Sequence, residues 1–122
     1  YEAMGVARGD HDARQAAWLR NFAAFDAPHV AIVGIDHRFG EYGTLDLGCW
    51  LQSVLLLCEA EGVRSCAQAS LALYPQVSRD VLRVPNEVKI LCGIALGYED
   101  ESAPANACRT TREPLEHNVT FL

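Results

Sequence analysis

The sequence lacks any apolar run long enough for a membrane-spanning helix, which needs roughly 18–20 consecutive apolar residues. Its first residues also lack the charged start and the apolar segment of a secretory signal peptide. The formal net charge is −6, so the positive surplus used in non-specific nucleic-acid binding is missing as well. We therefore expect no membrane partner and no nucleic-acid partner.

The cysteines and histidines lack the spacing of a metal site. No two cysteines form a C-x-x-C pair and their number is odd, so neither a zinc knuckle nor a disulfide framework is indicated. A free cysteine in an apolar segment behaves as a small hydrophobic residue, so we expect core thiols in a reducing cytoplasm. The five are Cys49, Cys58, Cys66, Cys92 and Cys108.

Phosphate-loop and acid–base signatures are missing too. The sequence contains no G-x-G-x-x-G after a strand and no G-x-x-x-x-G-K-[ST], so a bound phosphate would depend more on side-chain cations. Asp36 and His37 are adjacent, but neighbours on an extended chain point apart. We interpret them as part of a surface loop and name no catalytic residue.

The composition is that of one globular domain. The chain has 122 residues, of which 50% are hydrophobic and 21% are charged, the size and balance of a single folded unit. Residues 10–25 have apolar positions at helical spacing, with Asp10 as a potential N-cap and Pro28 after the expected end. Residues 29–35 are a short β-rich apolar run and predict a buried strand.

Residues 44–61 predict the longest helix. Thr44 can cap it, Asp46 falls in its expected first turn, and Gly62 can end it. Apolar residues cover nearly every face, and a helix that is apolar all round must be buried all round. A chain of 122 residues would struggle to wrap this helix alone, so we expect a subunit interface as its second cover.

The rest of the chain continues to interleave helices and strands. Residues 65–70, SCAQAS, form a polar break that fits either a connecting turn or a loop whose small residues face a ligand. A short helix is expected over 75–83, with Pro75 in its first turn, and a long strand over 87–99. Residues 117–122 alternate like a terminal strand.

The segment RTTR places Arg109 and Arg112 around two hydroxyl residues in an acidic protein. Guanidinium groups suit phosphate oxygens. A solvated loop with two unpaired arginines fits the same pattern. The residues alone leave both interpretations open.

Several segments together resemble the FMN-dependent nitroreductase family. They are F-x-A-P, D-x-G, S-C-A-Q, G-Y-x-D-x-x-A-P-x-N and R-T-x-R-x-P-L, in that order along the chain. The combination is specific although no single motif is, and the resemblance covers essentially all 122 residues. It implies an α+β fold, with an antiparallel or mixed sheet flanked by helices.

The resemblance also implies a homodimer with FMN at the subunit interface and helix 44–61 in the dimer core. The SCAQ segment would lie against the isoalloxazine, with a backbone amide near N5, and the two arginines would reach the phosphate end. The implied activity is ping-pong: NAD(P)H reduces the flavin and leaves, and a nitroaromatic or quinone then enters. The implied cofactor-binding residues are Cys66, Ala67, Gln68, Ala69, Arg109 and Arg112.

The chain departs from the family pattern at two residues and in length. Gln68 stands where many members have Glu, and Ala69 stands where many have Gly. Members usually run near twice this length and carry an N-terminal phosphate-binding segment. We therefore expect residues 1–122 to form a single domain that is the C-terminal portion of a nitroreductase domain.

Other functions stay open at this point. The chain could be a catalytically inactive, flavin-free dimerisation module or a fragment of such an enzyme. Flavin destruction and dehalogenation also occur in related proteins. The sequence does not distinguish NADH from NADPH, nor a nitro compound from a quinone or free flavin.

Overall fold

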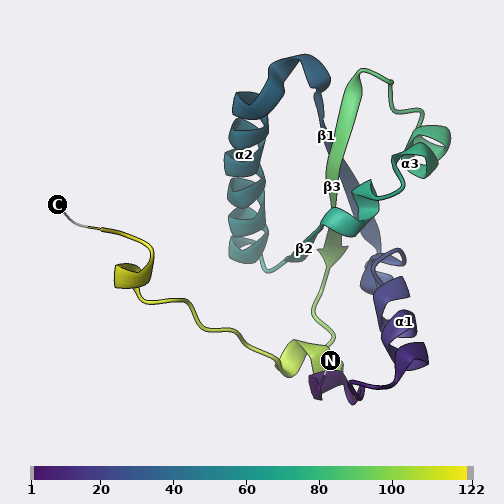
Figure 1. Cartoon of the computed structure of the whole chain (residues 1–122), viewed down its shortest axis with the longest axis vertical. Helices are drawn as coiled ribbons and strands as arrows, with labels where there is room; N and C mark the ends of the chain where they lie inside the picture. The colour runs from purple at the N-terminus through teal and green to yellow at the C-terminus, as the bar shows by residue number, and fades with distance from the viewer. Residues whose placement is uncertain (1, 121–122) are drawn as a thin grey trace.

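The computed structural model describes residues 2–120, which form a three-stranded antiparallel sheet flanked by helices (Figure 1). The strands are β1 (His29–Asp36), β2 (Arg64–Gln68) and β3 (Val88–Gly97), in the spatial order β1-β3-β2. The expected α+β class is confirmed, with a sheet that is antiparallel throughout these residues.

β3 is the centre of both the sheet and the core. It pairs with β1 on one side and with β2 on the other. Ile94, in the middle of β3, is only 1% exposed. The apolar runs at 29–35 and 87–99 are confirmed as the two long strands, since each is buried in a shared sheet.

α1 (His11–Leu19) begins where predicted and ends earlier. Asp10 is its N-cap, and the Asp10 carboxylate accepts a hydrogen bond from the Ala13 N–H at 2.9 Å. The helix ends before the predicted residue 25, because the Asn21 side chain folds back on the last turn. Its Nδ2 donates a hydrogen bond to the Trp18 carbonyl at 2.8 Å.

The chain between α1 and β1 makes a left-handed turn. Ala24, Phe25 and Asp26 have φ values of 49°, 55° and 66°, a conformation that costs non-glycine residues about 1–2 kcal/mol each. Such a turn persists only where its surroundings hold it. Here Ala24 is buried, and Asp26 forms an ion pair with Arg20 at 3.0 Å.

α2 (Gly40–Ala60) begins before the predicted cap at Thr44. The Thr44 hydroxyl donates to the Gly40 carbonyl at 3.0 Å, so Thr44 lies inside the helix and its predicted role as N-cap is wrong. Asp46 consequently lies beyond the first turn. Gly62 has φ 72° and ends the helix as predicted, because glycine adopts this conformation without a side-chain clash.

The two faces of α2 differ in burial. Gly43 approaches β1 so closely that a Cβ at this position would lie 2.9 Å from Ile35 Cδ1. The opposite face is open: Leu45 and Leu56 are 65% and 61% exposed. The expectation that the chain alone would not wrap this helix is confirmed, because the sheet covers only one of its faces (Figure 1). Burial of the remaining faces in a subunit interface stays a prediction.

The polar break expected at 65–70 is a strand followed by a short helix. β2 forms its first part, and the 3-10 helix η4 (Ala69–Ala72) continues from it. Pairing with β3 makes β2 a strand, and local composition does not reveal such a distant contact. α3 (Pro75–Leu82) confirms the next helix, with Pro75 at its first position.

After β3 the chain leaves the sheet as an extended tail (Figure 1). The predicted strand at 117–122 is absent up to residue 120, since no other strand lies beside the tail to pair with it. The rest of that segment lies outside the described residues. The 3-10 helices of the tail and of the earlier connections are η1 (Glu2–Met4), η2 (Ala24–Asp26), η3 (His37–Phe39), η5 (Pro104–Ala107) and η6 (Leu115–His117).

All five cysteines are free, and none is fully buried, so the expectation of core thiols is wrong for the single chain. The exposed thiols are those of Cys49, Cys66 and Cys108.

Within residues 2–120, no helix combines the length and hydropathy needed to cross a membrane. The same residues contain no cluster of three or more His, Cys, Asp or Glu that could hold a metal ion.

Candidate functional site

Gln68 differs from the other predicted site residues because its side chain is buried, with 4% exposed. Its Nε2 donates to the Asn21 carbonyl at 2.9 Å. Its Oε1 and the buried Ser70 Oγ have no hydrogen-bond partner among the described residues. The side chain thus joins the end of β2 to the turn after α1. Sequence reasoning missed this contact, which spans 47 positions.

The other predicted residues of this segment are small and exposed. Cys66 and Ala67 lie on β2, and Ala69 begins η4. β2 is an edge strand of the sheet, and no side chain caps η4, so this surface consists largely of backbone and short side chains. Desolvation raises the pKa of the Cys66 thiol, which keeps the thiol protonated at neutral pH and disfavours a nucleophilic role.

η4 rests on β3 through one close contact. Gly93 of β3, the partner of Gln68 in the sheet, has no side chain, and Leu71 of η4 fills that space. A Cβ at Gly93 would lie 3.1 Å from Leu71 Cβ and would collide with Leu71 Cδ1. The position of the β2–η4 segment therefore depends on glycine at this site.

We expect Gly93→Ala to destabilise the protein by about 1–3 kcal/mol, because overpacking displaces Leu71. Gly48→Ala on α2 is the matched control. A Cβ at Gly48 meets nothing within 4 Å, and alanine in a helix is favoured over glycine by about 1 kcal/mol. Thermal unfolding should show a lower Tm for the first variant and an equal or higher Tm for the second. An unchanged Tm for Gly93→Ala would contradict this packing account.

Arg109 already has a carboxylate partner in this structure. Its Nη2 forms an ion pair with Glu99 Oε1, and Arg64 Nε contacts Glu99 Oε2 at 3.1 Å. Arg64 also pairs with Glu59 near the end of α2. The side chain of Glu99 is only 17% exposed, so its pairs are screened less by solvent than fully exposed ones. Glu99 therefore connects Arg109 of the tail to Arg64, the first residue of β2.

Arg112 is placed differently. Its Nη1 donates to Thr110 Oγ1 at 3.3 Å and to the Thr111 carbonyl at 3.4 Å. Both are long contacts to neutral oxygens, and no carboxylate pairs with Arg112 among the described residues. This guanidinium is consequently the one of the predicted pair that remains available to an anion.

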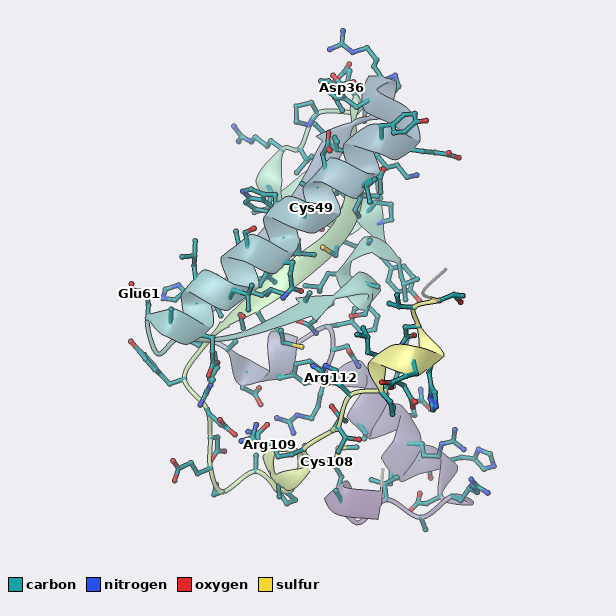
Figure 2. The ribbon with its side chains drawn as sticks, turned by 90° about the vertical axis from the view of Figure 1, so that its left-hand side faces the viewer. Asp36, Cys49, Glu61, Cys108, Arg109 and Arg112 are labelled. Atoms are coloured by element: carbon teal, nitrogen blue, oxygen red, sulfur yellow. The ribbon has the colours of Figure 1, made fainter. Side chains whose placement is uncertain are left out.

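The predicted site residues come from two parts of the fold. One group lies at the β2–η4 junction and the other on the tail, where Arg109 and Arg112 lie well below Asp36 in the lower half of the view (Figure 2). The chain of ion pairs through Glu99 connects the tail to the start of β2. Arg109 is thus tied to the end of β2 that is distant from Gln68, while Arg112 stays outside that chain.

Asp36 and His37 form no acid–base pair. Asp36 binds Arg38, and the hydrogen bond from the Arg38 side chain lowers the pKa of Asp36 to about 2. His37 Nδ1 instead contacts the Glu87 carbonyl at 2.8 Å. At neutral pH Asp36 is therefore ionised. The interpretation of this segment as a loop is wrong, because Asp36 is the last residue of β1 and His37 begins η3.

An open apolar hollow lies between α2 and the end of β1. It measures about 320 Å³ and contains none of the predicted site residues. The hollow lies on the side of α2 that faces β1, away from the β2–η4 junction. Its lining residues are Ile35, Phe39, Gly43, Asp46, Leu47 and Trp50.

Comparison with known proteins places this geometry in a family. The 4-nitrobenzoate reductase of Nocardioides sp. is 38% identical over 98% of this chain and 49% of its own length. Nitroreductase NfnB of Mycolicibacterium smegmatis is 34% identical over 99% of this chain and 51% of its own length. The chain therefore spans about half the length of these relatives.

The backbone also superimposes closely on that of a solved structure. The crystal structure of the FMN-dependent nitroreductase NfnB from Mycobacterium smegmatis in complex with NADPH matches with a TM-score of 0.94 at 33% identity, over 100% of this chain and 55% of that one. A sequence model described as "Nitroreductase family" matches residues 2–98. The protein therefore belongs to the nitroreductase family.

Proposed function

We propose that this chain forms part of an NAD(P)H-dependent FMN oxidoreductase that reduces nitroaromatic or quinone-type acceptors. The observation that carries the proposal is the agreement, over the whole chain, with a nitroreductase described as FMN-dependent and complexed with NADPH. Relatives named for 4-nitrobenzoate and nitrobenzene reduction support the nitroaromatic class. We extend the proposal to quinone acceptors and to a ping-pong order, in which NAD(P)H leaves before the acceptor enters.

The residues of this chain fit the ring end and the phosphate end of FMN. At the β2–η4 junction, Ala67 and Ala69 are exposed and short, so a flat ring can approach the backbone closely. On the tail, Arg112 has no carboxylate partner among residues 2–120. A guanidinium in that state can form charge-assisted hydrogen bonds with phosphate oxygens.

Each group has a defined role in the proposal. Bound FMN supplies the redox chemistry, while the protein binds and orients the reactants. Ala67, Ala69 and the short side chain of Cys66 give the ring access to backbone amides. Arg112 binds phosphate directly, and Arg109 positions the tail through Glu99.

The proposal includes a homodimer. The outer face of α2 exposes leucines that water would otherwise surround, and burying one such side chain stabilises a complex by about 1.5–3 kcal/mol. The same face on a second copy is the natural cover, because a two-fold dimer pairs identical surfaces. We retain the cytoplasm as the predicted location of this dimer.

Because the chain spans 49–55% of these relatives, the activity of the whole protein is itself part of the proposal. We propose that residues 1–122 correspond to the C-terminal portion of a nitroreductase domain. Arg109 and Arg112 would then be one share of the phosphate site, and other residues of the complete protein would supply the rest.

The activity can be tested with NADPH, 4-nitrobenzoate and the protein loaded with FMN. We expect NADPH oxidation that depends on both the protein and the nitro compound, and a parallel assay with a benzoquinone tests the broader acceptor class. Reduction of a quinone but not of 4-nitrobenzoate would contradict the nitroaromatic assignment. If neither acceptor supports oxidation, the proposed enzymatic function is wrong.

A further inference from the structure

The buried amide of Gln68 lies where two constrained segments meet. On one side is the β2–η4 junction, which Gln68 itself begins as the N-cap residue of η4. On the other side is the Asn21 carbonyl, which accepts both Gln68 Nε2 at 2.9 Å and the Ala24 N–H at 3.2 Å. A single carbonyl therefore ties the junction to the first residue of the left-handed turn.

The chemistry of this contact requires an amide. Asn21 offers a carbonyl oxygen, which only accepts hydrogen bonds, so the group that faces it must donate. The Nε2 of glutamine does so, whereas an ionised glutamate of the same length would place a carboxylate oxygen against the carbonyl oxygen. With only 4% of Gln68 exposed, little water is available to relieve that repulsion.

The left-handed turn explains why such a contact matters. Three consecutive non-glycine residues with positive φ are unfavourable unless their surroundings hold them. The Gln68 hydrogen bond comes from 47 positions away and is part-buried, unlike the exposed Arg20–Asp26 ion pair. It is therefore a stronger candidate to hold the turn than the surface pair.

We propose that Gln68 is a positioning residue whose side-chain amide holds the β2–η4 junction against the left-handed turn, and that in this chain, where the Asn21 carbonyl faces the side chain, glutamate cannot replace it at neutral pH. The junction is the segment assigned above to the flavin ring, so the consequence for FMN rests on the proposed function. Through this contact, Gln68 keeps the backbone at Ala67 and Ala69 in place without its own side chain reaching the ring.

The test is the pH dependence of Gln68→Glu, measured on the full chain by thermal unfolding between pH 4 and pH 8. A protonated carboxyl group can donate to Asn21, so the folded state raises the pKa of the introduced glutamate above the ordinary value of about 4.3. The folded state then binds more protons than the unfolded state. Stability relative to the parent is therefore retained at pH 4 and lost as pH rises.

We expect the Tm of Gln68→Glu to be near that of the parent at pH 4 and lower by roughly 5–10 °C at pH 8. Gln15→Glu, at an exposed position of α1, is the matched control and should follow the parent throughout. Gln68→Met removes the donor without adding charge, so its Tm should fall by a similar amount at every pH. This second variant decides the question if Gln68→Glu fails to fold at pH 8.

Two results would overturn the proposal: a Gln68→Glu profile that follows Gln15→Glu, or a Gln68→Met variant as stable as the parent. The FMN consequence has a separate readout. At pH 8 the Kd for FMN should rise roughly tenfold in Gln68→Glu and recover towards pH 5. If the parent protein binds no FMN, the proposed function fails, while the Tm profiles still decide whether Gln68 holds the junction.

Discussion

Replacing Arg112 with alanine should weaken FMN binding by roughly ten- to a hundredfold. A hydrogen bond to a charged group contributes about 1.5–3 kcal/mol, and every 1.4 kcal/mol is a factor of about ten in Kd. Arg112 should contribute the whole of this free energy to phosphate binding, because no carboxylate pairs with it among the described residues. Titration of the purified protein with FMN, followed by flavin fluorescence, measures the change.

Arg109→Ala is the matched comparison for this prediction. Arg109 lies on the same tail, but Glu99 already neutralises it. A phosphate would have to compete with that pair, so removing Arg109 should change the FMN Kd less than removing Arg112 does. Equal losses from both variants would show that Arg109 leaves Glu99 to bind phosphate directly. A larger loss from Arg109→Ala would reverse our assignment of the two roles.

A lysine at Leu56 should break the proposed dimer. Leu56 lies on the outer face of α2 and is 61% exposed in the single chain, so the substitution leaves the fold of the chain largely intact. Within an interface, the same lysine would bury a charge without a partner, at a penalty of several kcal/mol. We expect the dimer Kd to rise by roughly a hundredfold or more, as measured by analytical ultracentrifugation.

The control for Leu56→Lys is Gln15→Lys, which adds the same charge at an exposed position of α1. It should leave the dimer unchanged. Circular dichroism of both variants checks that the helices are retained. A Leu56→Lys protein that remains dimeric at micromolar concentration would show that the outer face of α2 is not the interface.

The elements predicted correctly from sequence are those whose signals are local. Asp10 can cap a helix because its own carboxylate reaches Ala13, and Gly62 ends α2 because glycine alone adopts its φ freely. β1 and β3 are apolar runs buried in the sheet, and α3 starts at a proline. Each of these signals lies within a few residues of the structure that it predicts.

The errors arose where distant residues decide the local conformation. β2 looks like a polar break, and it becomes a strand only because β3 lies beside it. The helical spacing of residues 10–25 continues past the real end of α1, where Asn21 and the left-handed turn take over. Such contacts override local propensity and leave no periodic pattern in the sequence.

Two of the family segments meet in the fold, which explains why their combination was informative. A Cβ at Gly97, in the segment G-Y-x-D, would lie 2.8 Å from Cδ of Pro28, in the segment F-x-A-P. The glycine and the proline therefore pack directly on each other where β3 passes the start of β1. Residue patterns indicated neither this contact nor the pairing of Arg109 with Glu99.

The candidate site was harder to predict than the fold because backbone carries much of it. Ala67 and Ala69 have no side-chain chemistry to recognise, and only the family resemblance pointed to them. Gln68 looked like a polar residue free to face a ligand. In the structure it is buried, and its amide serves the architecture of the site instead.

FMN binding by this protein is tested most directly by a visible spectrum of the purified protein after incubation with FMN and removal of free flavin by gel filtration. We expect a retained flavin band that bleaches on addition of NADPH under nitrogen and is weaker in Arg112→Ala. A folded protein that elutes without flavin at every FMN concentration tested would contradict the claim that these residues form part of an FMN site. It would favour a flavin-free dimerisation role.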